Sequence, residues 1–290
     1  MDSKLEATFG EVDFVEGQNG FELVEVKNSA GSATIALQGA QLLSWTPAGE
    51  KPVVWLSKNA KYMQGKSVRG GIPICCPWFG PHPEESSYPA HGFARNLVWE
   101  VGGTKSLTDA TQVVLRLVPN EASWPYPSEL ECRIKVGQTL EMELITRNTG
   151  LEPFTLGCAL HTYFEVGDVR KIEILGLEEA TYIDKVNGGK NRQSGPVTVN
   201  SEVDRIYLDT ASDCLIRDPI YNRVIRVEKE GSRSTVVWNP WVDKADKMGD
   251  LGDDGYLNML CVESCNAADD VAIVPPGKSH RLSVRYSVLA

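Results

Sequence analysis

The sequence predicts an all-β fold, a single large antiparallel β-sandwich that spans residues 1–290 and carries only a few short helices. Three observations lead to this prediction. Apolar residues recur with a period of two, Gly, Pro, Asn and Asp separate the apolar runs at short intervals, and no long amphipathic helix is evident. The chain contains no Gly- or Ser-rich linker, low-complexity stretch or internal repeat, so nothing indicates a second domain.

The clearest predicted strands alternate apolar residues with charged or polar ones. Leu140, Met142 and Leu144 are separated by two glutamates, and the same pattern occurs in 113–117 and 282–288. Alternation directs one face of a strand toward a core and the other toward water. Further β-type runs occupy 21–26, 33–37, 130–136, 154–160, 223–228 and 235–238. A short helical turn is expected around 256–261.

Two segments depart from this pattern. Residues 66–95 contain five prolines, too many for a central strand, so a long irregular loop is expected there. The loop also holds side chains that are typical of a functional segment, namely Trp78, Phe79, His82, His91 and Arg95. Residues 242–254 contain five aspartates against two lysines, which predicts a solvated surface loop.

The composition excludes several classes of partner. The chain has 29 basic and 39 acidic residues, for a formal net charge of −10, and it has no long basic run. Nucleic-acid binding depends on neutralising phosphates, and anionic membrane surfaces attract basic segments, so neither partner is expected. Hydrophobic residues make up 42% and charged residues 23%, which is typical of a globular protein and argues against disorder.

The cysteines and the start of the chain predict a cytoplasmic protein. The seven cysteines are odd in number, and none of them has the Cys-x2-Cys spacing of a zinc site. We therefore expect buried free thiols in a reducing compartment. Residues 1–14 lack the basic segment and apolar core of a signal peptide, and no stretch has the roughly 20 apolar residues of a transmembrane helix.

Two ionisable residues lie in apolar surroundings. His161 follows a strand-like run in GCALHTYFEV, and Glu263 follows Met259–Val262 in NMLCVES. A partly buried histidine can titrate near neutral pH, and desolvation would raise the pKa of the glutamate and make it a better base. Taken alone, His161 also fits a structural core histidine, and Glu263 also fits a strand end that faces water.

Two arginines bracket the proline-rich segment. Arg69 precedes Gly70-Gly71, where the backbone can approach a ligand closely, and Arg95 ends the HGFAR motif. The planar guanidinium suits phosphate or carboxylate, although surface ion pairs would equally explain each residue. Asp204 could accept hydrogen bonds from hydroxyls or act as a turn residue. The seven tryptophans could stack on a sugar, but core packing explains any single one.

The common signatures of nucleotide-binding, zinc-protease and serine-hydrolase sites are missing. The chain has no Gly-x4-Gly-Lys-Ser/Thr loop, no His-Glu-x2-His and no Gly-x-Ser-x-Gly motif. These absences favour acid/base chemistry without a metal or a covalent nucleophile, or else simple binding.

Several motifs together resemble one family. SVRGGIPICCPWFGPH, AHGFARN, LHTYFEV, EVDRIY, VVWNPW and CVES occur in the order found in glucose-6-phosphate 1-epimerases, the hexose-phosphate mutarotases of the aldose 1-epimerase superfamily. The resemblance extends from about residue 20 to the C-terminus. It implies a galactose mutarotase-like β-sandwich with a sugar site in a cleft on one sheet, a monomeric state and no cofactor.

The resemblance also implies roles for individual residues. His161 and Glu263 match the catalytic histidine and glutamate of the family, and Asp204 matches an aspartate that binds sugar hydroxyls. The family's substrate-holding arginines, which contact the phosphate in particular, correspond to Arg69 and Arg95. His91 matches a motif position and is expected to contribute to substrate binding.

The implied reaction is the interconversion of the α and β anomers of a hexose 6-phosphate. Glu263 would take the proton of the anomeric hydroxyl while His161 protonates the ring oxygen, and rotation followed by closure would give the other anomer. Three alternatives stay open at this point: an epimerase for unphosphorylated aldoses, a glycoside hydrolase using Glu263 with Asp204, and a non-catalytic carbohydrate-binding module.

The net charge adds a further expectation about the site. A dianionic substrate that approaches an acidic protein needs local attraction, which Arg69, Arg95 and the nearby Lys66 could supply. We therefore expect a small positive cleft on a negative surface, with the two arginines close together and free of carboxylate partners.

Overall fold

A computed structural model describes residues 10–120 and 124–289 of the chain. Residues 1–9, on which most of the expectation about a leader sequence rests, lie outside this range. Within the described residues, no helix combines the length and the apolar character that a membrane crossing requires.

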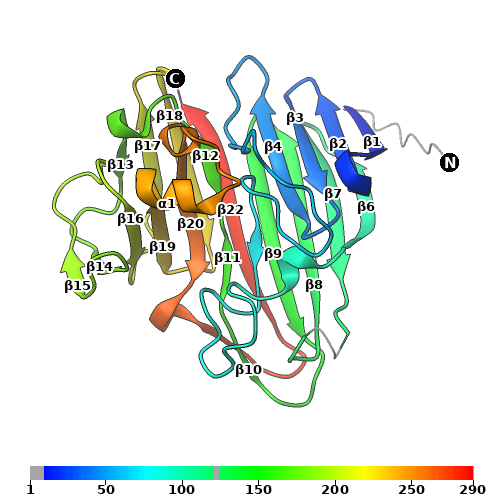
Figure 1. Cartoon of the computed structure of the whole chain (residues 1–290). Coiled ribbons are helices and arrows are strands. Elements are labelled where there is room, and N and C mark those ends of the chain that lie inside the picture. Colours follow the sequence, from blue (N-terminus) through cyan, green and yellow to red (C-terminus); the bar gives the residue numbers. More distant parts are fainter. Residues whose placement is uncertain (1–9, 121–123, 290) are drawn as a thin grey trace.

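Two eight-stranded antiparallel sheets dominate the fold (Figure 1), which confirms the predicted all-β class. The first, called the β9–β22 sheet, has the order β13 (Glu173–Leu175), β17 (Cys214–Asp218), β18 (Arg223–Glu230), β22 (Ser279–Leu289), β9 (Leu140–Asn148), β8 (Ser128–Gly137), β7 (Ala110–Leu117) and β6 (Glu100–Ser106). The second, called the β19–β20 sheet, has the order β15 (Lys190–Arg192), β14 (Thr181–Asp184), β16 (Val203–Tyr207), β19 (Ser234–Asn239), β20 (Met259–Asn266), β11 (Cys158–Leu160) and β5 (Ile74–Cys75), with β12 (Tyr163–Glu165) also paired to β20.

Smaller elements complete the structure. A four-stranded sheet at the N-terminal side contains β1 (Gly10–Glu16), β2 (Glu22–Asn28), β3 (Gly31–Ala36) and β4 (Gln41–Pro47), and β10 (Phe154–Leu156) pairs with β21 (Ala272–Val274). The described residues contain one α-helix, α1 (Trp241–Met248), and five short 3-10 turns: η1 (Gln18–Gly20), η2 (Ala94–Asn96), η3 (Val169–Lys171), η4 (Gly255–Leu257) and η5 (Ala268–Asp270).

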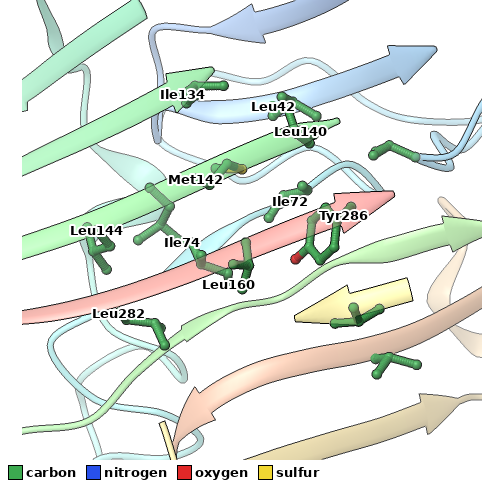
Figure 2. Packing of buried hydrophobic residues seen from close by; sticks show 14 of the residues in the cluster. Leu42, Ile72, Ile74, Ile134, Leu140, Met142, Leu144, Leu160, Leu282 and Tyr286 are labelled. Atoms are coloured by element: carbon green, nitrogen blue, oxygen red, sulfur yellow. The ribbon is translucent and has the colours of Figure 1, made fainter. Parts of the chain in front are cut away.

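The core lies between the two large sheets. Figure 2 shows Ile74 and Leu160 of the β19–β20 sheet beside Leu282 and Tyr286 of β22. These side chains belong to one continuous buried cluster. Their burial follows from the alternation noted in the sequence, which directs every second residue of β9 and β22 inward.

Strand β20 is buried on both faces, and this determines what lies on its outer side. Leu260 and Val262 point into the core, whereas Cys261 and Cys265 belong to a second apolar cluster on the opposite face. Since side chains alternate along a strand, Glu263 shares the face of Cys261 and Cys265. The second cluster also includes Ala245 of α1, so this helix packs over the outer face of the β19–β20 sheet.

Three local expectations need correction. The run 154–160 is not one strand, because it breaks at Gly157 into β10 and β11, which belong to different sheets. Residues 242–254 are not simply a solvated loop, because they contain most of α1, with Ala245 and Leu251 buried. The turn expected around 256–261 is limited to the 3-10 turn Gly255–Leu257, and β20 begins at Met259.

The expectations for the cysteines and for the proline-rich segment agree with the structure. All seven cysteines are buried free thiols. Residues 66–95 are mainly irregular, apart from the two-residue strand β5 and the turn η2.

One hydrogen bond ties the two large sheets together just beside His161. The Thr162 and Tyr286 hydroxyls are 2.6 Å apart, and both residues are fully buried. Tyr286→Phe leaves the Thr162 hydroxyl without this partner, which should lower the free energy of unfolding by about 1–3 kcal/mol. Urea denaturation measures the change. Tyr88→Phe, at a residue that is 37% exposed, is the control, and an equal effect of the two substitutions would contradict the role of the buried bond.

Candidate active site

A cavity of about 810 Å³ opens on the outer face of the β19–β20 sheet. It brings together all six residues that the sequence singled out: Arg69, His91, Arg95, His161, Asp204 and Glu263. They come from β16, β20 and three connecting segments, so the cavity forms only when distant parts of the chain are in place. A neighbouring hollow of about 780 Å³ is lined mainly by prolines and aromatic residues and contains none of these six.

His161 and Glu263 form a close pair on the floor of the cavity. His161 lies in the short break between β11 and β12, and Glu263 lies on β20, the strand with which both pair. The Nε2 atom of His161 is 3.4 Å from Oε1 of Glu263. The Glu263 side chain is 1% exposed and that of His161 is 13% exposed, so the imidazole covers the carboxyl from the cavity side.

The pair has an unusual electrostatic state because it is desolvated. Burial raises the pKa of Glu263 well above its ordinary value, and the charge of Asp204 raises it further. Burial lowers the pKa of His161 well below its ordinary value, and the cationic Arg95 acts in the same direction. Both shifts oppose charge, so burial favours the state in which both groups are neutral and the one proton shared by the pair lies on Glu263.

Aromatic rings fix the position of the His161 imidazole. The ring of Tyr163 stacks on it at 4.9 Å with an interplanar angle of 12°, and Trp238 meets its edge at 6.1 Å. Two atoms of this pair, Nδ1 of His161 and Oε2 of Glu263, are buried without a hydrogen-bond partner. Packing, rather than hydrogen bonds from these two atoms, therefore orients the two groups.

His91 is a second imidazole on the cavity wall. Its backbone has a φ of 68°, an uncommon conformation for a side-chain-bearing residue. The Gly80 N–H donates to its Nδ1 at 3.3 Å, so the proton of the neutral ring lies on Nε2. Burial lowers the pKa of His91 to about 4, and the neutral ring is therefore a hydrogen-bond donor at physiological pH.

Arg69 differs from the sequence-based expectation. Its Nε donates to Oδ1 of Asp250 at 3.0 Å, and its Nη1 donates to the Tyr163 hydroxyl at 2.9 Å. The expectation that both arginines are free of carboxylate partners is therefore wrong for this residue. Arg69 lines the cavity, but its charge is balanced, and it connects Tyr163 to the segment after α1.

Arg95 agrees with the expectation. It donates from Nη2 to the carbonyl of Ala90 at 2.7 Å. Among the described residues, no carboxylate lies within ion-pair distance of Arg95, Lys66 or Lys185, all of which line the cavity. With Arg69 and Lys244 the lining has five cationic groups against the carboxyls of Asp204 and Glu263, so the cavity is locally positive on an acidic protein.

Asp204 lies on the cavity wall in β16, paired in register with Trp238. Burial raises its pKa, which the nearby lysines Lys244 and Lys185 partly offset. The Nζ atom of Lys244 is 3.9 Å from the Asp204 carboxylate and 2.7 Å from that of Glu202. Asp204 is therefore a hydrogen-bond acceptor whose charge is partly offset by the nearby lysines.

Sequence reasoning missed three residues of this site, Tyr163, Lys185 and Lys244, and it considered Trp238 only as one of seven tryptophans that could stack on a sugar. Tyr163 lies two residues after His161, and period two alone would have placed both on one face. Lys244 was hidden in a segment interpreted as a solvated loop. The available groups support proton transfer, while a metal ligand set is limited to His161, Cys261 and Glu263 in the described part of the chain.

Comparisons with known proteins identify related chains. The model of a family described as aldose 1-epimerase matches residues 22–287. A relative from Escherichia coli, named “Putative glucose-6-phosphate 1-epimerase”, is 38% identical over 89% of this chain and 88% of its own length. A relative of the same name from Cenchrus ciliaris is 33% identical over 99% of this chain and 90% of its own length. A solved structure described as a “putative mutarotase” from Salmonella typhimurium superposes with a TM-score of 0.89 at 34% identity, over 99% of this chain and 96% of that one.

The raised pKa of Glu263 has a consequence for stability. A carboxyl whose pKa is raised on folding stabilises the protein below its unfolded pKa of about 4.3, and this contribution is lost as the pH rises. Glu263→Gln removes the ionisable group, so the variant should gain stability relative to the parent chain between pH 4 and pH 8. Chemical denaturation at several pH values measures the difference.

Glu129→Gln, at a side chain that is 51% exposed, provides the control for this pH series. Its difference from the parent chain should change little with pH. A Glu263→Gln variant that loses relative stability toward pH 8 would instead indicate an ionised Glu263 paired with protonated His161.

Proposed function

The chain belongs to the aldose 1-epimerase family, and we propose that this epimerase interconverts the α and β anomers of D-glucose 6-phosphate or a closely related hexose 6-phosphate. The observation that carries this proposal is the buried His161–Glu263 pair on the floor of a cavity that is locally positive. The pair supports acid/base chemistry, and the cations support an anionic substrate.

The proposed mechanism uses the shared proton of the pair. Opening of the sugar ring needs one group to take the proton of the anomeric hydroxyl and another to protonate the ring oxygen. We assign the first role to Glu263 and the second to His161. Rotation about the bond next to the aldehyde exposes its other face, and the two residues then exchange roles as the ring closes. The pair starts and ends the turnover with one proton.

Substrate binding would prepare the pair for these roles. In the free protein burial favours the proton on Glu263, whereas the assigned roles need an ionised Glu263 and a protonated His161. Arg95 lowers the pKa of Glu263, so it favours the carboxylate. The negative phosphate favours the imidazolium. We propose that this proton passes from Glu263 to His161 when the sugar phosphate binds, which requires the bound substrate to favour the imidazolium more than it disfavours the carboxylate.

The free cations support a phosphate position at one end of the cavity. Arg95 and Lys66 line the same cavity. Gln38 connects the two segments, since it donates to the Lys66 carbonyl at 2.7 Å and is bridged to Val98, three residues after Arg95. A guanidinium and an ammonium without carboxylate partners suit a dianion. A phosphate held there anchors the sugar at a distance from the reacting carbon and so orients the ring.

Asp204, His91 and Arg69 complete the proposal. Asp204 would accept hydrogen bonds from sugar hydroxyls, and the neutral His91 would donate one. Arg69 retains an Nη2 group for the substrate and also holds Tyr163 against the His161 ring.

A second candidate function is the epimerisation of unphosphorylated aldoses. The Arg69–Asp250 ion pair favours it, since it removes one of the two arginines expected to hold a phosphate. A non-catalytic carbohydrate-binding module would not need His161 and Glu263 in contact. The rates on glucose 6-phosphate and on galactose distinguish these alternatives.

Glu263→Gln tests the proton-transfer assignment. The amide keeps the shape of the carboxyl but cannot accept the proton, so the rate of anomer exchange should fall by roughly 10²–10⁴-fold. NMR exchange spectroscopy on glucose 6-phosphate measures this rate, and calorimetry should show that sugar-phosphate binding persists. Wild-type turnover in this variant would show that Glu263 is not the base.

Arg95→Ala tests the phosphate position. The substitution removes a cation that meets the phosphate but not the rest of the sugar. The KM for glucose 6-phosphate should therefore rise by about tenfold or more, as expected for a lost charged hydrogen bond, and the KM for glucose should change little. Arg133→Ala, at a half-exposed arginine on the other large sheet, is the matched control. An equal effect of Arg95→Ala on both sugars would exclude Arg95 from phosphate binding.

A further inference from the structure

Cys261 is a buried thiol beside the His161–Glu263 pair that the proposed reaction does not use. It lies two residues before Glu263 on β20 and shares its face of the sheet. The register Tyr163↔Cys261 and Leu160↔Ser264 brings His161 from the neighbouring strand to the same level. One sulfur, one nitrogen and one oxygen atom of these three residues lie within 4.8 Å of one another.

This set of atoms matches the preferences of a thiophilic divalent cation. Zn²⁺ binds thiolate, imidazole and carboxylate at bond lengths that place its ligand atoms about 3.5 Å apart in a tetrahedral site. His161 Nε2 and Glu263 Oε1 already have this spacing, at 3.4 Å. Bringing the Cys261 sulfur into the same range needs a shift of roughly 1 Å at most.

Two further observations favour a ligand at this position. Oε2 of Glu263 and Nδ1 of His161 are buried without hydrogen-bond partners, so no bond at these two atoms prevents the side chains from adjusting to an ion held by Nε2 and Oε1. The His161 and Glu263 side chains line the cavity, so a fourth coordination position would face the space where a sugar binds. Asp204 attracts a cation to this region and Arg95 repels it, so we expect weaker binding than at a structural zinc site.

We propose that His161, Cys261 and Glu263 form a reversible inhibitory site for Zn²⁺ or a similar thiophilic cation. On binding, the Cys261 thiol and the His161–Glu263 pair each release a proton to solvent, and the metal takes the lone pairs that proton transfer needs. The ion is an inhibitor and not a cofactor, because it occupies the groups that must exchange protons with the sugar.

Zinc titration of the anomer-exchange rate is the first test. Zn²⁺ should inhibit the parent protein, and EDTA should restore the rate. Half-inhibition of Cys261→Ala should need at least about tenfold more Zn²⁺, each variant being compared with its own uninhibited rate. Cys265→Ala is the matched control, because Cys265 lies on the same strand and face, on the other side of Glu263. Equal sensitivity of Cys261→Ala and the parent protein would overturn the proposal.

Cobalt binding is the second test, and it does not depend on enzyme activity. Co²⁺ should give a near-ultraviolet thiolate charge-transfer band with the parent protein and with Cys265→Ala, and Zn²⁺ should abolish the band. Cys261→Ala should show no band. If it fails to fold, Cys261→Ser preserves the volume and should also lack the band. A missing band in the parent protein, or an unchanged band in Cys261→Ala, would refute the metal site even if the proposed epimerase activity were correct. A band that depends on Cys261 would support the metal site even if that activity were absent.

Discussion

The chemistry of this protein depends on the burial of β20 on both faces. Leu260 and Val262 are packed between the large sheets, and Cys261 and Cys265 flank Glu263 on the other face. A carboxyl on such a strand has little water to solvate its charge, so its neighbours decide whether it ionises. The same packing that stabilises the sandwich therefore raises the pKa of this carboxyl well above its ordinary value.

The two arginines of the proline-rich segment, Arg69 and Arg95, lie in different electrostatic surroundings. Arg69 is held by Asp250 and Tyr163, so it builds the wall against which the His161 ring stacks. Arg95 is held only by a backbone carbonyl, so its charge is free to act on the cavity. The ion-paired Arg69 therefore makes the cavity wall rigid, whereas the unpaired Arg95 can attract an anionic ligand. Such local attraction is needed because the protein as a whole is acidic.

The sequence was sufficient to predict those features of the fold and the site that depend on a local pattern of residues. Alternation in 140–144 and 282–288 predicted β9 and β22, and the apolar context of His161 and Glu263 pointed to the pair that the structure brings into contact. The sequence was insufficient to predict features that depend on contacts between residues far apart in the chain. The partner of Arg69 lies 181 positions further along the chain, the break at Gly157 moves two halves of one apolar run into different sheets, and the buried side of α1 is hidden among aspartates.

The distribution of the cavity residues along the chain links ligand binding to folding. Arg69 and Glu263 lie in distant parts of the sequence, and each is positioned by a different part of the β19–β20 sheet and its connections. A ligand in this cavity therefore binds only the assembled chain and opposes its global unfolding, by about 2.7 kcal/mol at a concentration one hundred times its dissociation constant. The abundance of its ligand would in this way set how long the protein resists proteolysis.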